Sequence, residues 1–181
     1  MPTERVLITV TTYPTLSGKY TELVCSAGLR SDGSWIRLYP IPLRQIDEMK
    51  KFHKWEWIEV LVDKNTADRR PESYRPDTDS IRLTGEQIDS KHWDLRVQWI
   101  EKNGIYTDIN VLINKNKESG VSLATFKPND MVDFIWEKST PYWDANKLAA
   151  VEARLAEGDL FNPITNFKIA KKVPYTFKYI F

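Results

Sequence analysis

The sequence predicts a mainly β protein with inserted helices (α+β), built as one or two small antiparallel barrels. Short segments rich in Val, Ile, Thr and aromatic residues recur along the chain, which is typical of strands. Turn signals such as Tyr13-Pro14 and Asp32-Gly33 separate these segments. The helical patterns fall between the strands without the regular alternation that a parallel sheet would show, so an antiparallel architecture is favoured.

The segment "GSWIRLYPIPLR" is the most informative of the strand signals. Apolar residues such as Ile36 and Leu38 would give this strand a buried face, yet Arg37, Tyr39 and Arg44 lie among them. Its polar side either binds an anionic ligand or only keeps the strand soluble, and we favour the binding face. In the first half of the chain, strands are expected at residues 6–12, 20–29, 33–44 and 55–65, with a loop at 15–20.

Apolar residues at helical spacing predict four helices. Pro42 suits a first helical residue, and Thr107 or Asp108 and then Asp144 suit N-caps. Gly158 suits the end of the last helix. The helices are expected at residues 42–52, 89–104, 107–120 and 142–159.

The remaining segments set the expected domain organisation. "TADRRPESYRPDTD" (66–79) is predicted to be a polar loop, and short strands are expected at residues 81–83, 121–130, 131–138 and 166–181. We expect a first barrel lobe at 1–103 and a second, β-rich lobe with one clear helix at 104–181. Because the last alternating pattern runs to Phe181, we expect the final strand to pair to its end or the natural chain to continue.

Composition limits the function classes. The formal net charge is +1, so any site for a polyanion must be a local cluster. The single cysteine, Cys25, excludes an internal disulfide, and His53 or His92 could pair with it only if the fold brought them together. No secretory or membrane-spanning pattern is present, so a cytoplasmic location is expected. No nucleotide-binding, hydrolase or zinc motif occurs, and no catalysis, metal or cofactor is expected.

Basic and aromatic residues form the candidate site. Single-stranded nucleic acid is bound by cations that contact phosphates and by aromatic rings that stack on bases. Arginines crowd together in the proline-containing stretch "RRPESYRP", and a long loop in a compact domain is usually functional or disordered. In the alternative interpretation, Arg37 and Arg44 pair with Glu22, Asp47 or Glu48. The candidate nucleic-acid-binding residues are Lys19, Arg37, Tyr39, Arg44, Arg69, Arg70, Tyr74 and Arg75.

Several stretches together resemble an uncharacterised bacterial family with a dual OB-fold architecture that is associated with prokaryotic defence and conflict systems. They are "VLITVTTYPTLSGKYTELVCSAGL", "WIRLYPIPLR", "RRPESYRP", "SLATFKPNDMVDF" and "VPYTFKYIF". The resemblance implies OB-like barrels and a nucleic-acid-binding role as an accessory to an effector protein. OB barrels bind oligonucleotides on one sheet face and its flanking loops, where several of these Arg and Tyr residues fall.

We therefore expect a non-catalytic module that binds single-stranded or structured nucleic acid with little sequence preference. One alternative is a sensor for a nucleotide or another small anion, bound between the lobes in a closed pocket. A second alternative is a protein interaction module that docks a partner on Trp55, Trp57, Trp136 and Trp143. A metal-dependent nuclease would need converging carboxylates, and the Asp77–Asp79 and Asp130–Asp133 pairs are interpreted as loop and capping residues instead.

Overall fold

The computed structural model describes residues 1–157 and 167–181. These residues form two compact units, the first from residues 1–12 and 24–129 and the second from residues 13–23, 130–157 and 167–181. The division into lobes at 1–103 and 104–181 stays a prediction. In the structure, residues 104–129 belong with the first unit.

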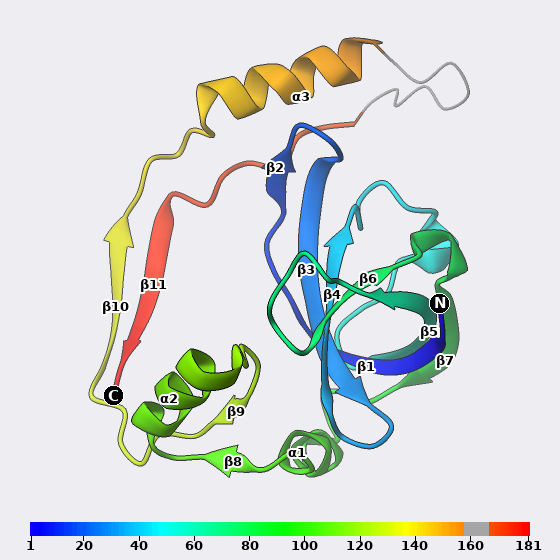
Figure 1. Cartoon of the computed structure of the whole chain (residues 1–181). Helices are drawn as coiled ribbons and strands as arrows, with labels where there is room; N and C mark the ends of the chain where they lie inside the picture. Colours follow the sequence, from blue (N-terminus) through cyan, green and yellow to red (C-terminus); the bar gives the residue numbers. More distant parts are fainter. Residues whose placement is uncertain (158–166) are drawn as a thin grey trace. The chain divides into compact units, whose positions relative to one another are not determined.

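A closed five-stranded barrel forms the centre of the first unit. Around the ring, β1 pairs with β3, β3 with β4, β4 with β6, β6 with β5, and β5 again with β1 (Figure 1). Of these five pairs in the ring, the pair between β4 and β6 is parallel and the other four are antiparallel. The predicted fold class, mainly β with inserted helices and an OB-like barrel, is confirmed. The barrel strands are β1 (Thr3–Thr11), β3 (Thr21–Arg30), β4 (Trp35–Ile41), β5 (Glu56–Lys64) and β6 (Ser73–Pro76).

Strand β1 closes the barrel because it pairs on both of its edges. Residues 3–7 pair with β5, and residues 6–11 pair with β3. A bulge between Ile8 and Val10 interrupts the second pairing. Because a bulge bends a strand and increases its twist, β1 can turn from one neighbour to the next.

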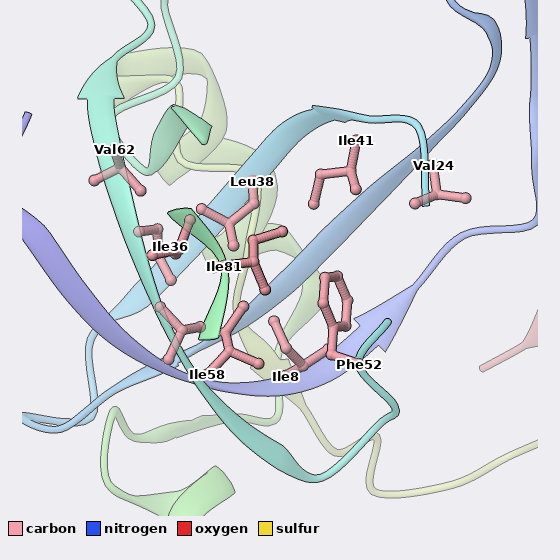
Figure 2. Packing of buried hydrophobic residues seen from close by; sticks show 11 residues of the cluster. Ile8, Val24, Ile36, Leu38, Ile41, Phe52, Ile58, Val62 and Ile81 are labelled. Carbon is pink, nitrogen blue, oxygen red and sulfur yellow. The ribbon is translucent and has the colours of Figure 1, made fainter. Parts of the chain in front are cut away.

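The barrel interior is filled by branched aliphatic side chains together with the ring of Phe52 (Figure 2). Side chains alternate between the two faces of a strand, so every second residue of β4 and β5 points inward. In β4, Ile36 and Leu38 are fully buried, which directs Arg37 and Tyr39 to the outer face. The core cluster consists of Val6, Ile8, Val24, Ile36, Leu38, Ile41, Phe52, Ile58, Val60, Val62 and Ile81.

The helix expected at residues 42–52 is wrong. The structure has only a 3-10 turn there, η1 (Glu48–Lys50). Asp47 has a non-helical backbone, with φ −50° and ψ 138°, and caps that turn by accepting a hydrogen bond from the Met49 amide. Leu43, Ile46 and Phe52 nevertheless pack on the barrel core from irregular backbone. These three apolar residues therefore pack on the core as their spacing suggested, but they do not form a helix.

The loop expected at residues 66–79 is only partly a loop. Its second half contains β6 and the 3-10 turn η2 (Thr78–Ser80), which Asp77 caps through the Asp79 amide. The strand β6 has four residues, too few for a visible alternation, and its pairing with β4 and β5 defines it. The predicted short strand at 81–83 is confirmed as the longer β7 (Arg82–Gln87), which pairs with β5.

Two predicted helices follow the barrel strands in the first unit. They are α1 (Trp93–Glu101) and α2 (Ile109–Ser119), and Asp108 caps α2 through the Asn110 amide as expected. Gly120, with φ +73°, ends α2. The parallel pair β8 (Ile105–Tyr106) and β9 (Thr125–Phe126) flanks α2, so little of the strand expected at 121–130 forms.

The second unit contains β2 (Thr15–Ser17), β10 (Asp133–Lys138), α3 (Ala145–Glu157) and β11 (Tyr175–Ile180). The predicted cap of α3 is confirmed, since Asp144 accepts a hydrogen bond from the Lys147 amide, 3.0 Å away. The predicted end of this helix at Gly158 lies outside the described residues. No helix in the described ranges combines the length and the apolar content that a membrane span requires.

Candidate functional site

A pocket with a volume of about 740 Å³ lies on the first unit. It is bordered by the outer face of β4, by the segment that joins β5 to β6, and by the residues around the end of α2. Four arginines line it and only one carboxylate does, so positive charge is concentrated here although the chain as a whole is nearly neutral. Its lining residues are Arg37, Tyr39, Asn65, Ala67, Asp68, Arg69, Arg70, Arg75, Asn116, Gly120 and Ser122.

Arg37 reaches the pocket from the middle of β4. Its Nη1 lies 3.2 Å from Asp68 Oδ2, and both side chains are largely buried, 12% and 16% exposed. The same nitrogen donates to the Ser73 hydroxyl at 3.2 Å. The alternative interpretation, in which Arg37 pairs with Glu22, Asp47 or Glu48, names the wrong partners for this arginine. The parallel pairing of β4 with β6 sets Arg37 opposite Ser73 and beside the loop that carries Asp68.

Asp68 connects the arginines of the pocket. Its Oδ1 accepts from the Arg70 amide and from Arg70 Nε, both at 3.1 Å, and its Oδ2 accepts from Arg37 and from the Ser73 hydroxyl. Loss of hydration opposes ionisation, but the Arg70 amide, the Ser73 hydroxyl and the two guanidinium groups outweigh it and hold the pKa of Asp68 below its ordinary value. With four donors on two oxygens, this carboxylate serves to orient Arg37 and Arg70.

The other two arginines are more exposed. Arg75 Nε donates to Asn65 Oδ1 at 3.1 Å, which leaves its terminal nitrogens for other acceptors. Arg69 is exposed, and no carboxylate among the described residues pairs with it. A guanidinium has five N–H donors, so all four arginines of the pocket retain donors that can bind an anion.

Tyr39 lies beside Arg37 on the outer face of β4. The Arg37 guanidinium carbon is 4.9 Å from the centre of the Tyr39 ring, a cation–π arrangement. The ring and the guanidinium together form a half-buried, partly aromatic surface of the pocket. Such a surface suits an unsaturated ring next to a negative group.

The opposite wall of the pocket is held in place by Glu72. This buried residue accepts hydrogen bonds from both the amide and the hydroxyl of Ser122, and its own carbonyl accepts from the Arg37 amide at 2.8 Å. Gly120 approaches the Arg69 carbonyl so closely that an added Cβ would lie 3.3 Å from it. The residues around the end of α2 are thereby tied to the loop that carries the arginines.

Sequence reasoning found five of the lining residues and missed the polar ones between them. Arg37, Tyr39, Arg69, Arg70 and Arg75 are brought together as expected. Nothing in their own sequence context distinguished the missed side chains, although Asp68 directly precedes the arginine pair. Those missed are Asn65, Asp68, Asn116 and Ser122.

Three candidate residues do not line the pocket. Tyr74 packs against the barrel core, and its ring lies under Arg30 and Lys64, with distances of 4.8 and 4.6 Å to the ring centre. Arg44 is exposed in the turn after β4 and has an interaction elsewhere. Lys19 belongs to the second unit and lies over the Tyr20 ring at 5.0 Å.

Cys25 lies next to the pocket on β3. Burial raises the pKa of its thiol, and the neighbouring Arg37 opposes this only in part. Neither histidine takes part: His53 lies beside Glu56, with 3.6 Å between Nδ1 and Oε2, and His92 precedes α1. The thiol is therefore held in its neutral form beside a cation.

The barrel lies within the match to one known family model. A family model described as Domain of unknown function (DUF8758) matches residues 2–102, which is more than half of the chain. The chain belongs to this family. The DUF8758 match includes every barrel strand and α1, and therefore all the arginines of the pocket, whereas Asn116, Gly120 and Ser122 lie beyond it. No curated protein and no solved structure matched the DUF8758 chain.

Proposed function

We propose that this chain is a non-catalytic module that binds single-stranded or structured nucleic acid through the arginine pocket, with little sequence preference. The observation that carries the proposal is the convergence of Arg37, Arg69, Arg70 and Arg75 with Tyr39 in one open pocket. The pocket lies on the outer face of β4 and the β5–β6 loop. OB barrels bind oligonucleotides on the corresponding sheet face and loop.

The chemistry of the pocket suits a phosphodiester chain. Guanidinium groups bind phosphate oxygens through paired N–H donors, and the Asp68 carboxylate fixes two of these groups before a ligand arrives. Fixed donors lose less side-chain entropy on binding than mobile ones. None of the four arginines requires a particular base, which favours tolerance of sequence.

The wider role is part of the proposal. We take the resemblance to a defence-associated bacterial family as support for an accessory role beside a defence or nucleic-acid-processing effector protein. A cytoplasmic location follows from that role.

A second candidate is a small anion such as a nucleotide. A volume of about 740 Å³ lies within the range of small-ligand sites, and the residues around the end of α2 enclose the pocket on one side. The two candidates differ in how affinity depends on ligand length. If the ligand is a nucleic acid, a longer oligonucleotide should bind more tightly because it also contacts residues beyond the pocket. If the ligand is a nucleotide, a mononucleotide should bind as tightly as an oligonucleotide, because all of its contacts lie within the pocket.

Fluorescence anisotropy with labelled single-stranded DNA, single-stranded RNA and duplex DNA tests the proposal. If three or four phosphates are neutralised, single-strand binding should weaken roughly 20- to 50-fold between about 50 and 200 mM salt, from a slope of about −0.7 per phosphate. Arg69→Glu should weaken binding at least about tenfold and lower this slope. Arg82→Glu, the same change at an exposed residue outside the pocket, should leave binding nearly unchanged.

Each alternative result has a defined meaning. Absence of binding to all three nucleic acids at about 50 mM salt and tens of micromolar protein would refute the nucleic-acid proposal. Full competition by a mononucleotide at equal concentration would favour the small-anion candidate instead.

A further inference from the structure

The ribbon formed by β10 and β11 in the second unit carries an aromatic face. The two strands are antiparallel, with Phe134 opposite Tyr179 and Trp136 opposite Phe177. Alternation places every second residue on the same side of the ribbon. The aromatic face consists of Phe134, Trp136, Tyr175, Phe177 and Tyr179, with Lys138 at one end.

The rings of this face contact one another and remain exposed. The centres of Phe134 and Tyr179 are 4.9 Å apart, and those of Trp136 and Tyr175 are 5.5 Å apart. Their exposed fractions run from 40% for Tyr175 to 62% for Tyr179. A two-stranded ribbon is only marginally stable by itself in water, so this face gains stability when it is covered.

The charges of the ribbon indicate what covers it. Asp133, Glu137 and Lys178 lie on the reverse face, where Glu137 and Lys178 form an ion pair of 2.7 Å. The aromatic face carries only Lys138. A single cation neutralises too little phosphate to hold a polyanion, whereas a nearly uncharged aromatic face is typical of the centre of a protein interface.

The area of the aromatic face matches the requirement of a symmetric dimer. Five aromatic side chains, each about half exposed, present roughly 500 Å² per copy if each has about 200 Å² in total. Two such faces bury about 1,000 Å², the lower bound of a specific interface. Exposed Val132 and Phe181, at the end of the ribbon, would add to this area.

We propose that the aromatic face pairs with the same face of a second copy of this chain, forming a homodimer. A two-fold axis that lies between the two faces and runs perpendicular to the strands would place the ribbons in opposite directions, so that Lys138 of each copy lies over the Phe134 and Tyr179 rings of the other. This arrangement keeps the two lysines apart and gives each an aromatic partner. The proposal does not depend on nucleic-acid binding by the arginine pocket.

Sedimentation velocity of the full chain from about 1 to 200 µM protein tests the dimer. Wild-type protein should show a monomer–dimer equilibrium, and Phe177→Lys should weaken dimerisation at least about 100-fold. Thr176→Lys adds the same charge on the reverse face, opposite Glu137, and should dimerise like wild type. Lys138→Glu keeps all five rings and should weaken the dimer about threefold to tenfold, even if Phe177→Lys perturbs the ribbon.

The contrary outcomes are equally clear. A wild-type monomer across the whole concentration range would overturn the proposal, as would a dimer that Phe177→Lys and Lys138→Glu leave unchanged. Loss of oligonucleotide binding by Phe177→Lys in a protein that is always monomeric would also overturn it, and would assign the face to nucleic acid.

Discussion

Replacement of Asp68 by Asn should destabilise the fold more than the loss of an exposed ion pair does. The amide keeps the size of the carboxylate but loses its charge, and its NH₂ group must face donors from either Arg70 or the Arg37 and Ser73 pair. Arg37, only 12% exposed, then loses its anionic partner, and a hydroxyl or amide donor loses an acceptor.

The expected loss in the free energy of unfolding follows from the burial of the Arg37–Asp68 ion pair. Breaking a fully buried ion pair costs about 3–5 kcal/mol. The pair between Arg37 and Asp68 retains some contact with water in an open pocket, so we expect a loss of about 2–3 kcal/mol in the free energy of unfolding. Glu86→Gln is the matched control. Glu86 is 62% exposed and its partner Arg5 is 41% exposed, so this ion pair should contribute less than about 1 kcal/mol.

Urea unfolding at several pH values provides the assay. The pKa of Asp68 is lowered in the folded state, so the stabilisation by its carboxylate is present above the unfolded pKa of about 3.9 and is lost as the pH falls through the folded pKa. The difference between wild type and Asp68→Asn should therefore be constant near neutral pH and shrink below about pH 4. The reasoning is refuted if Asp68→Asn costs no more than Glu86→Gln, or if the difference persists unchanged in strong acid.

Three further predictions address the core and the thiol. Gly28→Ala should lower the free energy of unfolding in urea by at least about 3 kcal/mol, because the new Cβ would lie 2.9 Å from a carbonyl carbon of β1. Strand β1 is paired on both edges and cannot easily move away. The control Gly85→Ala, at φ +78° with open space around it, should cost only about 1 kcal/mol. Ile58→Ala should cost about 2–5 kcal/mol, measured in the same way, since Ile58 is fully buried in the core. Cys25 should react with a maleimide at pH 7 more slowly than a free thiol, because burial raises its pKa. The reaction should be slower still in Arg37→Ala, because Arg37 favours the thiolate. An equal or faster rate in that variant would contradict this electrostatic account.

Much of the barrel could be predicted because its signals are local. The alternation in β4 and β5 already separates buried Ile36 and Ile58 from outward-facing neighbours, and the Asp-Gly turn predicts the hairpin between β3 and β4. The same alternation aimed Arg37 and Tyr39 outward, so part of the pocket could be anticipated.

Where an element lacks a local signal, sequence reasoning failed. The strand β6 is too short to alternate, and its first residues looked like loop. Apolar spacing at 42–52 suggested a helix, although those side chains reach the core from turns. In both places, tertiary packing and not local preference determines the backbone.

The sequence by itself determined which faces of the barrel strands are apolar and where the arginines occur. Only the tertiary structure decided that Asp68 would bind Arg37, 31 residues away along the chain, and that the end of α2 would border the same pocket. The physical reason is that barrel closure pairs β4 with β6 in parallel and sets Arg37 opposite Ser73. That register depends on the whole ring of strands, and no short stretch of the chain contains it.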